Sequence, residues 1–204
     1  ELEKKLPIQS LEICIDMTLA SYISCLRIVL IVPIIYLLDL GFLSSVDTEG
    51  LTSFYNYLAF VLFVVAGLTD YLDGYIARKT DTETPLGAML DLIADKLLVS
   101  LVMVWIVFLT TDPLIAIPAL IIVSRELVIS MLRQYVIEKK VKKDLSISFV
   151  GKSKTTIQII AISTLILAQE VNEIWLLSII AIWFAAIFSL YSLFTYVSEW
   201  FKHY

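Results

Sequence analysis

Hydrophobic residues in this chain fall into long, nearly continuous runs that are separated by short polar segments. Six runs are long enough to cross about 30 Å of hydrocarbon, which takes roughly 18 or more apolar residues in a helix. They cover residues 22–42, 54–78, 87–110, 113–137, 151–169 and 174–198. The alternating segments of about ten residues that build a transmembrane β-barrel do not occur. The pattern therefore predicts an all-α, polytopic membrane protein with six transmembrane helices.

The residues before the first run follow a different pattern. Within residues 1–20, Ile8, Leu11, Ile15 and Leu19 recur at helical spacing among charged residues. This spacing predicts a short N-terminal helix that lies in the membrane interface, and the alternative is a tail without a role. Residues 21–204 are then expected to form a single six-helix transmembrane domain.

Composition agrees with this architecture and narrows the chemistry. Of the 204 residues, 59% are hydrophobic, and the mean hydropathy of +0.89 excludes an ordinary soluble domain. Two cysteines and one histidine do not supply the ligands of a structural zinc site. Nothing in the composition points to a nucleic-acid partner, so the expected environment is the lipid bilayer.

Charge is divided unequally between the two sides of the predicted membrane domain. The three loops opposite the termini contain no Lys or Arg but hold six acids: Asp39, Asp47, Glu49, Asp112, Glu170 and Glu173. All fifteen Lys and Arg lie toward the other side, where a basic run over 139–143 is expected to face anionic headgroups. The positive-inside rule therefore predicts that both termini, and the turn between the second and third runs, face the cytoplasm.

Four carboxylates lie where a membrane protein rarely places them, at the end of the second run and the start of the third. Asp70 and Asp73 share one helical face, and Asp91 and Asp95 share another. In an antiparallel helical hairpin they would form two matched levels, about 6–8 Å and about 12 Å below the helix ends. Such a cluster cannot all ionise without compensation, and two hard divalent cations, Mg²⁺ or Mn²⁺, would supply it. We therefore expect a two-metal site for chemistry on a phosphate ester.

Several cations lie close enough in the sequence to take part. Arg27, one turn into the first run, either extends to the headgroups or contributes to the site. Arg125 and Arg133 lie on one side of the fourth run, where planar guanidinium groups suit phosphate oxygens, although a structural Arg–Glu pair between helices is the alternative. Lys152 and Lys154 open the fifth helix, where the helix dipole also favours an anion. Lys96 is expected to be an interface or headgroup residue rather than part of the site.

Read as one motif, the acidic segment resembles the signature of the CDP-alcohol phosphotransferases. The matching positions, with every spacer length in place, are Asp70, Asp73, Gly74, Ala77, Arg78, Gly87, Asp91 and Asp95. The resemblance implies a membrane enzyme that uses a CDP-linked donor, two divalent metals and an alcohol acceptor, and that releases CMP. It also implies a homodimer.

The same resemblance implies roles for individual residues. It places Asp70, Asp73, Asp91 and Asp95 around the metals, makes Asp95 the general base, and gives nucleotide binding to Gly74, Ala77, Arg78 and Ser24. At the entry to the first run the family usually has Asn-x2-Thr-x2-Arg, whereas this chain has Ser21, Ser24 and Arg27. Serine hydroxyls still donate hydrogen bonds, so the difference bears on nucleotide contacts rather than on the reaction.

The segments SRELVISMLRQY and FVGKSKTTIQ resemble the phosphatidylglycerophosphate synthases within this family. That likeness implies CDP-diacylglycerol as donor and sn-glycerol 3-phosphate as acceptor. The residues implied to hold the acceptor phosphate are Arg125, Arg133, Lys152 and Lys154. Two alternatives stay open: a sibling enzyme that takes inositol phosphate, serine or phosphatidylglycerol as acceptor, and a divalent-cation transporter whose acidic cluster is the permeation site.

Overall fold

A computed structural model describes residues 19–43, 49–80, 85–138 and 149–201, and these ranges are helical almost throughout. The elements are α2 (Leu19–Leu43), α3 (Glu49–Thr80), α4 (Pro85–Thr110), α5 (Pro113–Glu138), α6 (Phe149–Ala168), the 3₁₀ turn η2 (Asn172–Ile174) and α7 (Trp175–Phe201). Each predicted run falls on one α-helix, and the described ranges contain no strand. The all-α prediction is confirmed, whereas the predicted interfacial helix lies in residues outside the described ranges.

Five of these helices are long and apolar enough to cross a membrane: α2, α3, α4, α5 and α7. The described apolar part of α6 is shorter and runs from Thr155 to Ala168. The residues of α6 before Thr155, which include Lys152 and Lys154, have side chains outside the described set. Large apolar side chains such as those of Val32, Leu120 and Phe194 are at least 70% exposed, as a surface surrounded by lipid requires. The chain is an integral membrane protein.

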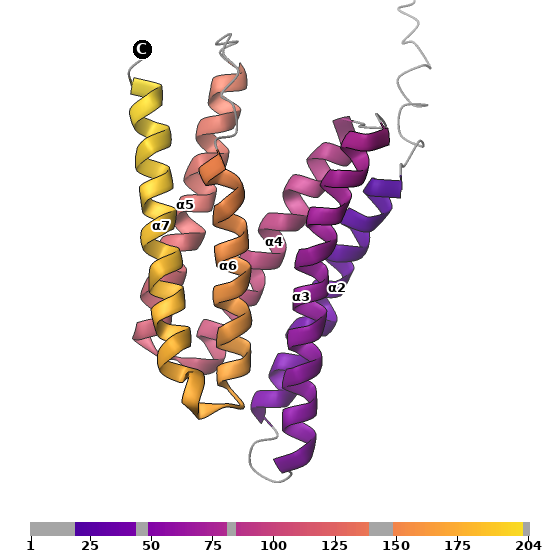
Figure 1. The fold of residues 1–204 in the computed structure, drawn as a ribbon, viewed down its shortest axis with the longest axis vertical. Helices are drawn as coiled ribbons and strands as arrows, with labels where there is room; N and C mark the ends of the chain where they lie inside the picture. Colours follow the sequence, from indigo (N-terminus) through magenta and orange to yellow (C-terminus); the bar gives the residue numbers. More distant parts are fainter. Residues whose placement is uncertain (1–18, 44–48, 81–84, 139–148, 202–204) are drawn as a thin grey trace, which may run out of the picture.

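The helices form two groups that α4 connects (Figure 1). α2 packs against α3 and α4, α7 packs against α5 and α6, and α3 contacts α6 across the middle. One cluster of buried apolar side chains draws on all six α-helices and includes Ile34, Phe63, Leu98, Met103 and Ile162. The core therefore holds the six helices together from the inside while their outer faces remain apolar.

Successive helices run in alternating directions (Figure 1). α3 ends and α4 begins at one end of the molecule, and α5 ends and α6 begins at that same end. At the opposite end, α2, α4 and α6 end and α3, α5 and α7 begin. This is the arrangement that the charge pattern requires, because it separates the acidic loops from the basic ones.

Candidate functional site

The four predicted metal-binding carboxylates come from two helices whose ends lie side by side. Asp70 and Asp73 belong to the last turns of α3, and Asp91 and Asp95 belong to the first turns of α4. The structure describes the side chains of Asp91 and Asp95, which are partly exposed, but not those of residues 70–80. Within the described side chains, no group of three or more His, Cys, Asp or Glu could hold a metal ion, and that set excludes Asp70 and Asp73.

A third helix, α2, packs against both helices of the predicted hairpin. α3 and α4 contact each other far less than each of them contacts α2. They diverge from their shared end, and α2 packs beside both (Figure 1). The first helix is therefore a third wall of the candidate site, because it lies along the helix that carries Asp91 and Asp95.

That third wall contributes two polar side chains. Arg27 of α2 donates from Nη1 to Oδ1 of Asp91 at 3.2 Å, and Ser24, one turn earlier, donates to the same oxygen at 3.3 Å. Arg27 and Ser24 are each only 1% exposed, whereas the Asp91 side chain is 41% exposed. Extension of Arg27 to the headgroups is therefore wrong, since its guanidinium points inward to a carboxylate of the predicted site.

A second polar network joins the helices that carry the predicted acceptor residues. Arg125 is buried and donates from Nε to the backbone oxygen of Ser189 at 3.2 Å and from Nη2 to Ser192 Oγ at 2.7 Å. Its Nη1 donates to Glu126 at 3.3 Å, and Gln158 of α6 donates to the same Glu126 oxygen at 3.4 Å. Arg125 thus pairs with a glutamate of its own helix rather than of another one, and its contacts to Ser189 and Ser192 join α5 to α7, which is a structural role.

Among the remaining cations, the structure describes the side chain of Lys96 but not those of Arg133, Lys152 and Lys154. Lys96 of α4 donates from Nζ to Ser130 Oγ of α5, which places it at a helix interface as expected. Arg133 lies in α5, and Lys152 and Lys154 lie in the first two turns of α6, but their side chains fall outside the described set. α5 ends and α6 begins at the same end of the molecule as the α3–α4 junction (Figure 1).

Gly67 of α3 lies where this helix packs against α6. A side chain at Gly67 would bring a Cβ within 3.0 Å of Ile159 Cδ1 on α6. The absence of a side chain at Gly67 therefore allows α3 and α6 to approach each other closely. Gly74, Ala77 and Arg78, the predicted nucleotide residues, lie further along α3 among the undescribed side chains.

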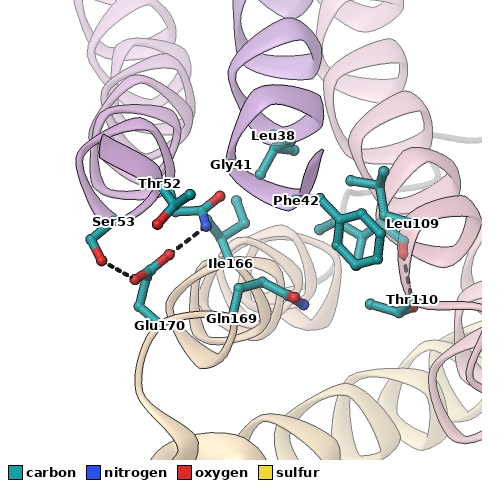
Figure 2. A pocket seen from close by; sticks show the side chains of 12 residues that line it. Leu38, Gly41, Phe42, Thr52, Ser53, Leu109, Thr110, Ile166, Gln169 and Glu170 are labelled. Atoms are coloured by element: carbon teal, nitrogen blue, oxygen red, sulfur yellow. Dashed lines mark hydrogen bonds between the residues drawn. The ribbon is translucent and has the colours of Figure 1, made fainter. Parts of the chain in front are cut away.

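A cavity of about 340 Å³ lies at the opposite end of the molecule, between α2, α3, α4 and α6 (Figure 2). The Glu170 carboxylate accepts hydrogen bonds from Ser53 Oγ and, at 2.6 Å, from Asn56 Nδ2. Gly41 is required here, because a Cβ at this position would lie 2.1 Å from Asn56 Oδ1. The cluster joins the ends of α3 and α6, so we interpret it as a structural contact far from the carboxylates of α4.

Comparison with known proteins decides the family. The family model described as CDP-alcohol phosphatidyltransferase matches residues 17–191, which is most of the chain and includes every carboxylate of the candidate site. The chain belongs to the CDP-alcohol phosphatidyltransferase family. The match begins before Ser24 and Arg27, so the third wall formed by α2 lies within the shared region.

Individual relatives in this family are similar over most of their length. A protein of Haemophilus influenzae is 38% identical over 141 residues, covering 69% of this chain and 76% of the relative. A protein of Rickettsia prowazekii is 37% identical over 185 residues, covering 89% of this chain and 94% of the relative. A Rickettsia bellii protein is 39% identical over 142 residues, covering 68% and 76%. Each is named CDP-diacylglycerol–glycerol-3-phosphate 3-phosphatidyltransferase.

Sequence reasoning missed the contact between α2 and Asp91. A signal was present, since Ser24 and Arg27 are three residues apart and so share a helical face. Their spacing alone did not indicate which helix that face meets. The Glu170 cluster gave no signal, because Asn56, Ser53 and Glu170 are scattered over more than a hundred residues of sequence.

Proposed function

We propose that the protein transfers the phosphatidyl group of CDP-diacylglycerol to sn-glycerol 3-phosphate, yielding phosphatidylglycerophosphate and CMP. The observation that carries the proposal is similarity over 89% of the chain to relatives named for this reaction, which are 36–37% identical. The intact spacing of the eight motif positions supports it, because those positions supply the groups that the reaction needs.

In this proposal Asp95 is the general base. Its carboxylate takes the proton from the 1-hydroxyl of glycerol 3-phosphate, and that oxygen forms a bond to the phosphorus that bears diacylglycerol. The bond between this phosphorus and the bridging oxygen breaks in line, and CMP leaves with the electron pair. Asp95 lies in the third turn of α4 and is partly exposed, which allows a substrate to reach it.

The donor set of the candidate site fits two divalent ions, Mg²⁺ or Mn²⁺. Asp70, Asp73, Asp91 and Asp95 offer only carboxylate oxygens, which are the ligands these hard cations prefer. When bound, the ions would stabilise negative charge on the pyrophosphate and on the CMP leaving group. Arg27 pairs with Asp91, and four carboxylates gathered at one place would favour the binding of divalent cations that neutralise them.

The proposal assigns the two substrates to different walls. Gly74, Ala77 and Arg78 of α3, with Ser24 of α2, would hold the nucleotide part of CDP-diacylglycerol, since small residues admit a flat ligand. Arg133, Lys152 and Lys154 would hold the acceptor phosphate, together with Arg125 if its guanidinium exchanges one of its contacts to α7. The active site would face the cytoplasm of a bacterial inner membrane, and the enzyme would act as a homodimer.

The experiment that tests the proposed function is CMP release by purified protein against a panel of acceptors. With CDP-diacylglycerol as donor, glycerol 3-phosphate should give the highest kcat/KM, and EDTA should abolish release in every case. A higher kcat/KM with inositol phosphate, serine or phosphatidylglycerol would instead identify a sibling enzyme. Divalent-cation flux into liposomes without CMP release would favour the transporter alternative.

A further inference from the structure

We infer that Arg27 and Ser24 of α2 are positioning residues for Asp91, holding one carboxylate oxygen so that the other is presented to the metal ions. The inference rests on the proposed function, because it gives the contact a purpose only if Asp91 binds a metal. It adds to that function a role for the first helix.

The first support is that the two oxygens of the Asp91 carboxylate have different surroundings. Both hydrogen bonds, from Arg27 Nη1 and from Ser24 Oγ, go to Oδ1 of Asp91. Among the residues that the structure describes, Oδ2 accepts no hydrogen bond, and the side chain is 41% exposed. One oxygen is therefore anchored to the protein interior, and the other is available to a ligand. Metal-binding carboxylates commonly have such supporting hydrogen bonds, which fix their orientation.

The second support is the burial of the donors. Arg27 and Ser24 are each 1% exposed, and they lie one turn apart on the face of α2 that packs against α4. A buried guanidinium in a membrane domain is costly unless it is paired, and its pairing marks a functional site by default. Arg27 could have reached the headgroups with little cost, yet it points inward to a predicted metal ligand.

The third support is the geometry of the helices. α4 carries Asp91 and Asp95, and it packs against α2 much more extensively than against α3. The position of these two carboxylates relative to Asp70 and Asp73 therefore depends on the α2–α4 interface. Arg27 and Ser24 lie in that interface, so they couple the packing of the first helix to the arrangement of the site.

The test measures Mn²⁺ binding to purified protein in detergent, without CDP-lipid, by electron paramagnetic resonance of the free ion. Arg27→Gln should raise the Kd for Mn²⁺ by about 10–100-fold, the usual effect of losing a supporting contact to a metal ligand. Arg27→Lys keeps the charge with fewer donors and should restore part of the affinity. Ser24→Ala should weaken binding less than Arg27→Gln and guards against a folding defect in the arginine variant.

Ile31→Ala is the matched control, because Ile31 is a buried residue one turn further along the same helix. It should lower Tm while leaving the Kd for Mn²⁺ unchanged, which separates packing from positioning. Unchanged or tighter Mn²⁺ binding in folded Arg27→Gln would overturn the inference. So would a raised KM for CDP-diacylglycerol with unchanged Mn²⁺ affinity, since Arg27 would then contact substrate directly.

The same titration distinguishes failure of the inference from failure of the proposed function. Wild-type protein should bind Mn²⁺, and Asp91→Asn should bind it more weakly. If the wild type bound none, the metal assignment and the positioning role would both be wrong. If the wild type and Asp91→Asn behaved as expected while the Arg27 variants matched the wild type, only the positioning role would be wrong.

Discussion

Two buried arginines show how this membrane domain uses charge at the level of single residues. Arg27 donates to Asp91 of another helix, and Arg125 donates to Glu126 and to two residues of α7. Each guanidinium is thus bonded within the protein rather than exposed to lipid, as the cost of an uncompensated charge requires. The difference lies in the partners: Arg27 contacts a predicted metal ligand, whereas Arg125 contacts mainly structural residues.

Replacing Asp95 tests the proposed base directly. In Asp95→Asn the amide cannot accept the acceptor's proton, so kcat for CMP release should fall by at least about 10²–10⁴-fold, while the protein remains folded in detergent. Asp112→Asn is the matched control, because Asp112 caps the start of α5 at the far end and Asn also caps helices well. Undiminished turnover in Asp95→Asn would remove this residue from the mechanism.

The predicted acceptor cations should affect one substrate only. Lys154→Met or Arg133→Met removes a charged donor to phosphate, so the KM for glycerol 3-phosphate should rise by about 10–100-fold. The KM for CDP-diacylglycerol should not change. Lys140→Met, in the basic run expected to face headgroups, serves as the control. Equal increases in both KM values would argue against a specific acceptor contact.

At the level of the element, α5 shows how a transmembrane helix accommodates an internal proline. Pro118 has no amide hydrogen, so the backbone oxygen of Leu114, four residues earlier, loses its usual donor. The indole Nε1 of Trp183 on α7 donates to that oxygen at 3.1 Å. A neighbouring helix thus satisfies the carbonyl that the proline frees, which is the general condition for proline inside a membrane helix.

A double-mutant cycle tests this compensation. Trp183→Phe should lower the free energy of unfolding by about 0.5–1.5 kcal/mol, because the Leu114 oxygen loses its donor. In a Pro118→Ala background the same change should cost less, since the introduced alanine supplies the missing backbone amide. The measurement is unfolding of detergent-solubilised protein with SDS.

Trp105→Phe is a suitable control for the loss of an indole. Within the described part of the chain, the buried Trp105 Nε1 has no hydrogen-bond partner. Its replacement should therefore show no hydrogen-bond loss and no coupling to Pro118. An equal cost of Trp183→Phe in both backgrounds would contradict the proposed compensation.

At the scale of the whole molecule, the two ends of the helices differ in chemistry. The end where α3 meets α4 carries the family motif, and the opposite end carries the cluster of Ser53, Asn56 and Glu170. α4 runs between the two helix groups, so it links the candidate site to the rest of the domain (Figure 1). Because the motif lies at one end only, the orientation of the protein in the membrane decides which compartment the candidate site faces. The water-soluble acceptor must come from that compartment.

The orientation can be tested by cysteine labelling in spheroplasts, after Cys14 and Cys25 are replaced by serine. Glu173→Cys, in the acidic 3₁₀ turn, should react with an impermeant maleimide from outside. Lys142→Cys, in the basic run, should react only after the membrane is permeabilised. The reverse pattern would place the motif outside the cell and would contradict the predicted topology.

Much of the architecture could be predicted from local sequence. The helices lie where the hydrophobic runs predicted them, because a bilayer requires a continuous apolar surface over a fixed length. The spacing of Asp91 and Asp95 placed both on the same helix at the start of α4, since residues four apart share a face. The family, too, could be identified from the sequence, because its motif is short, contiguous and fixed in spacing.

What the sequence determined by itself was therefore the set of helices, their alternation across the membrane and the chemical groups of the candidate site. Only the tertiary structure decided that α2 packs beside α4, that Arg27 and Ser24 contact Asp91, and that Arg125 contacts α7. The physical reason is that helix formation depends on neighbours within a few residues. The partner of a buried side chain, by contrast, depends on how whole helices cross and rotate, and no single helix encodes that.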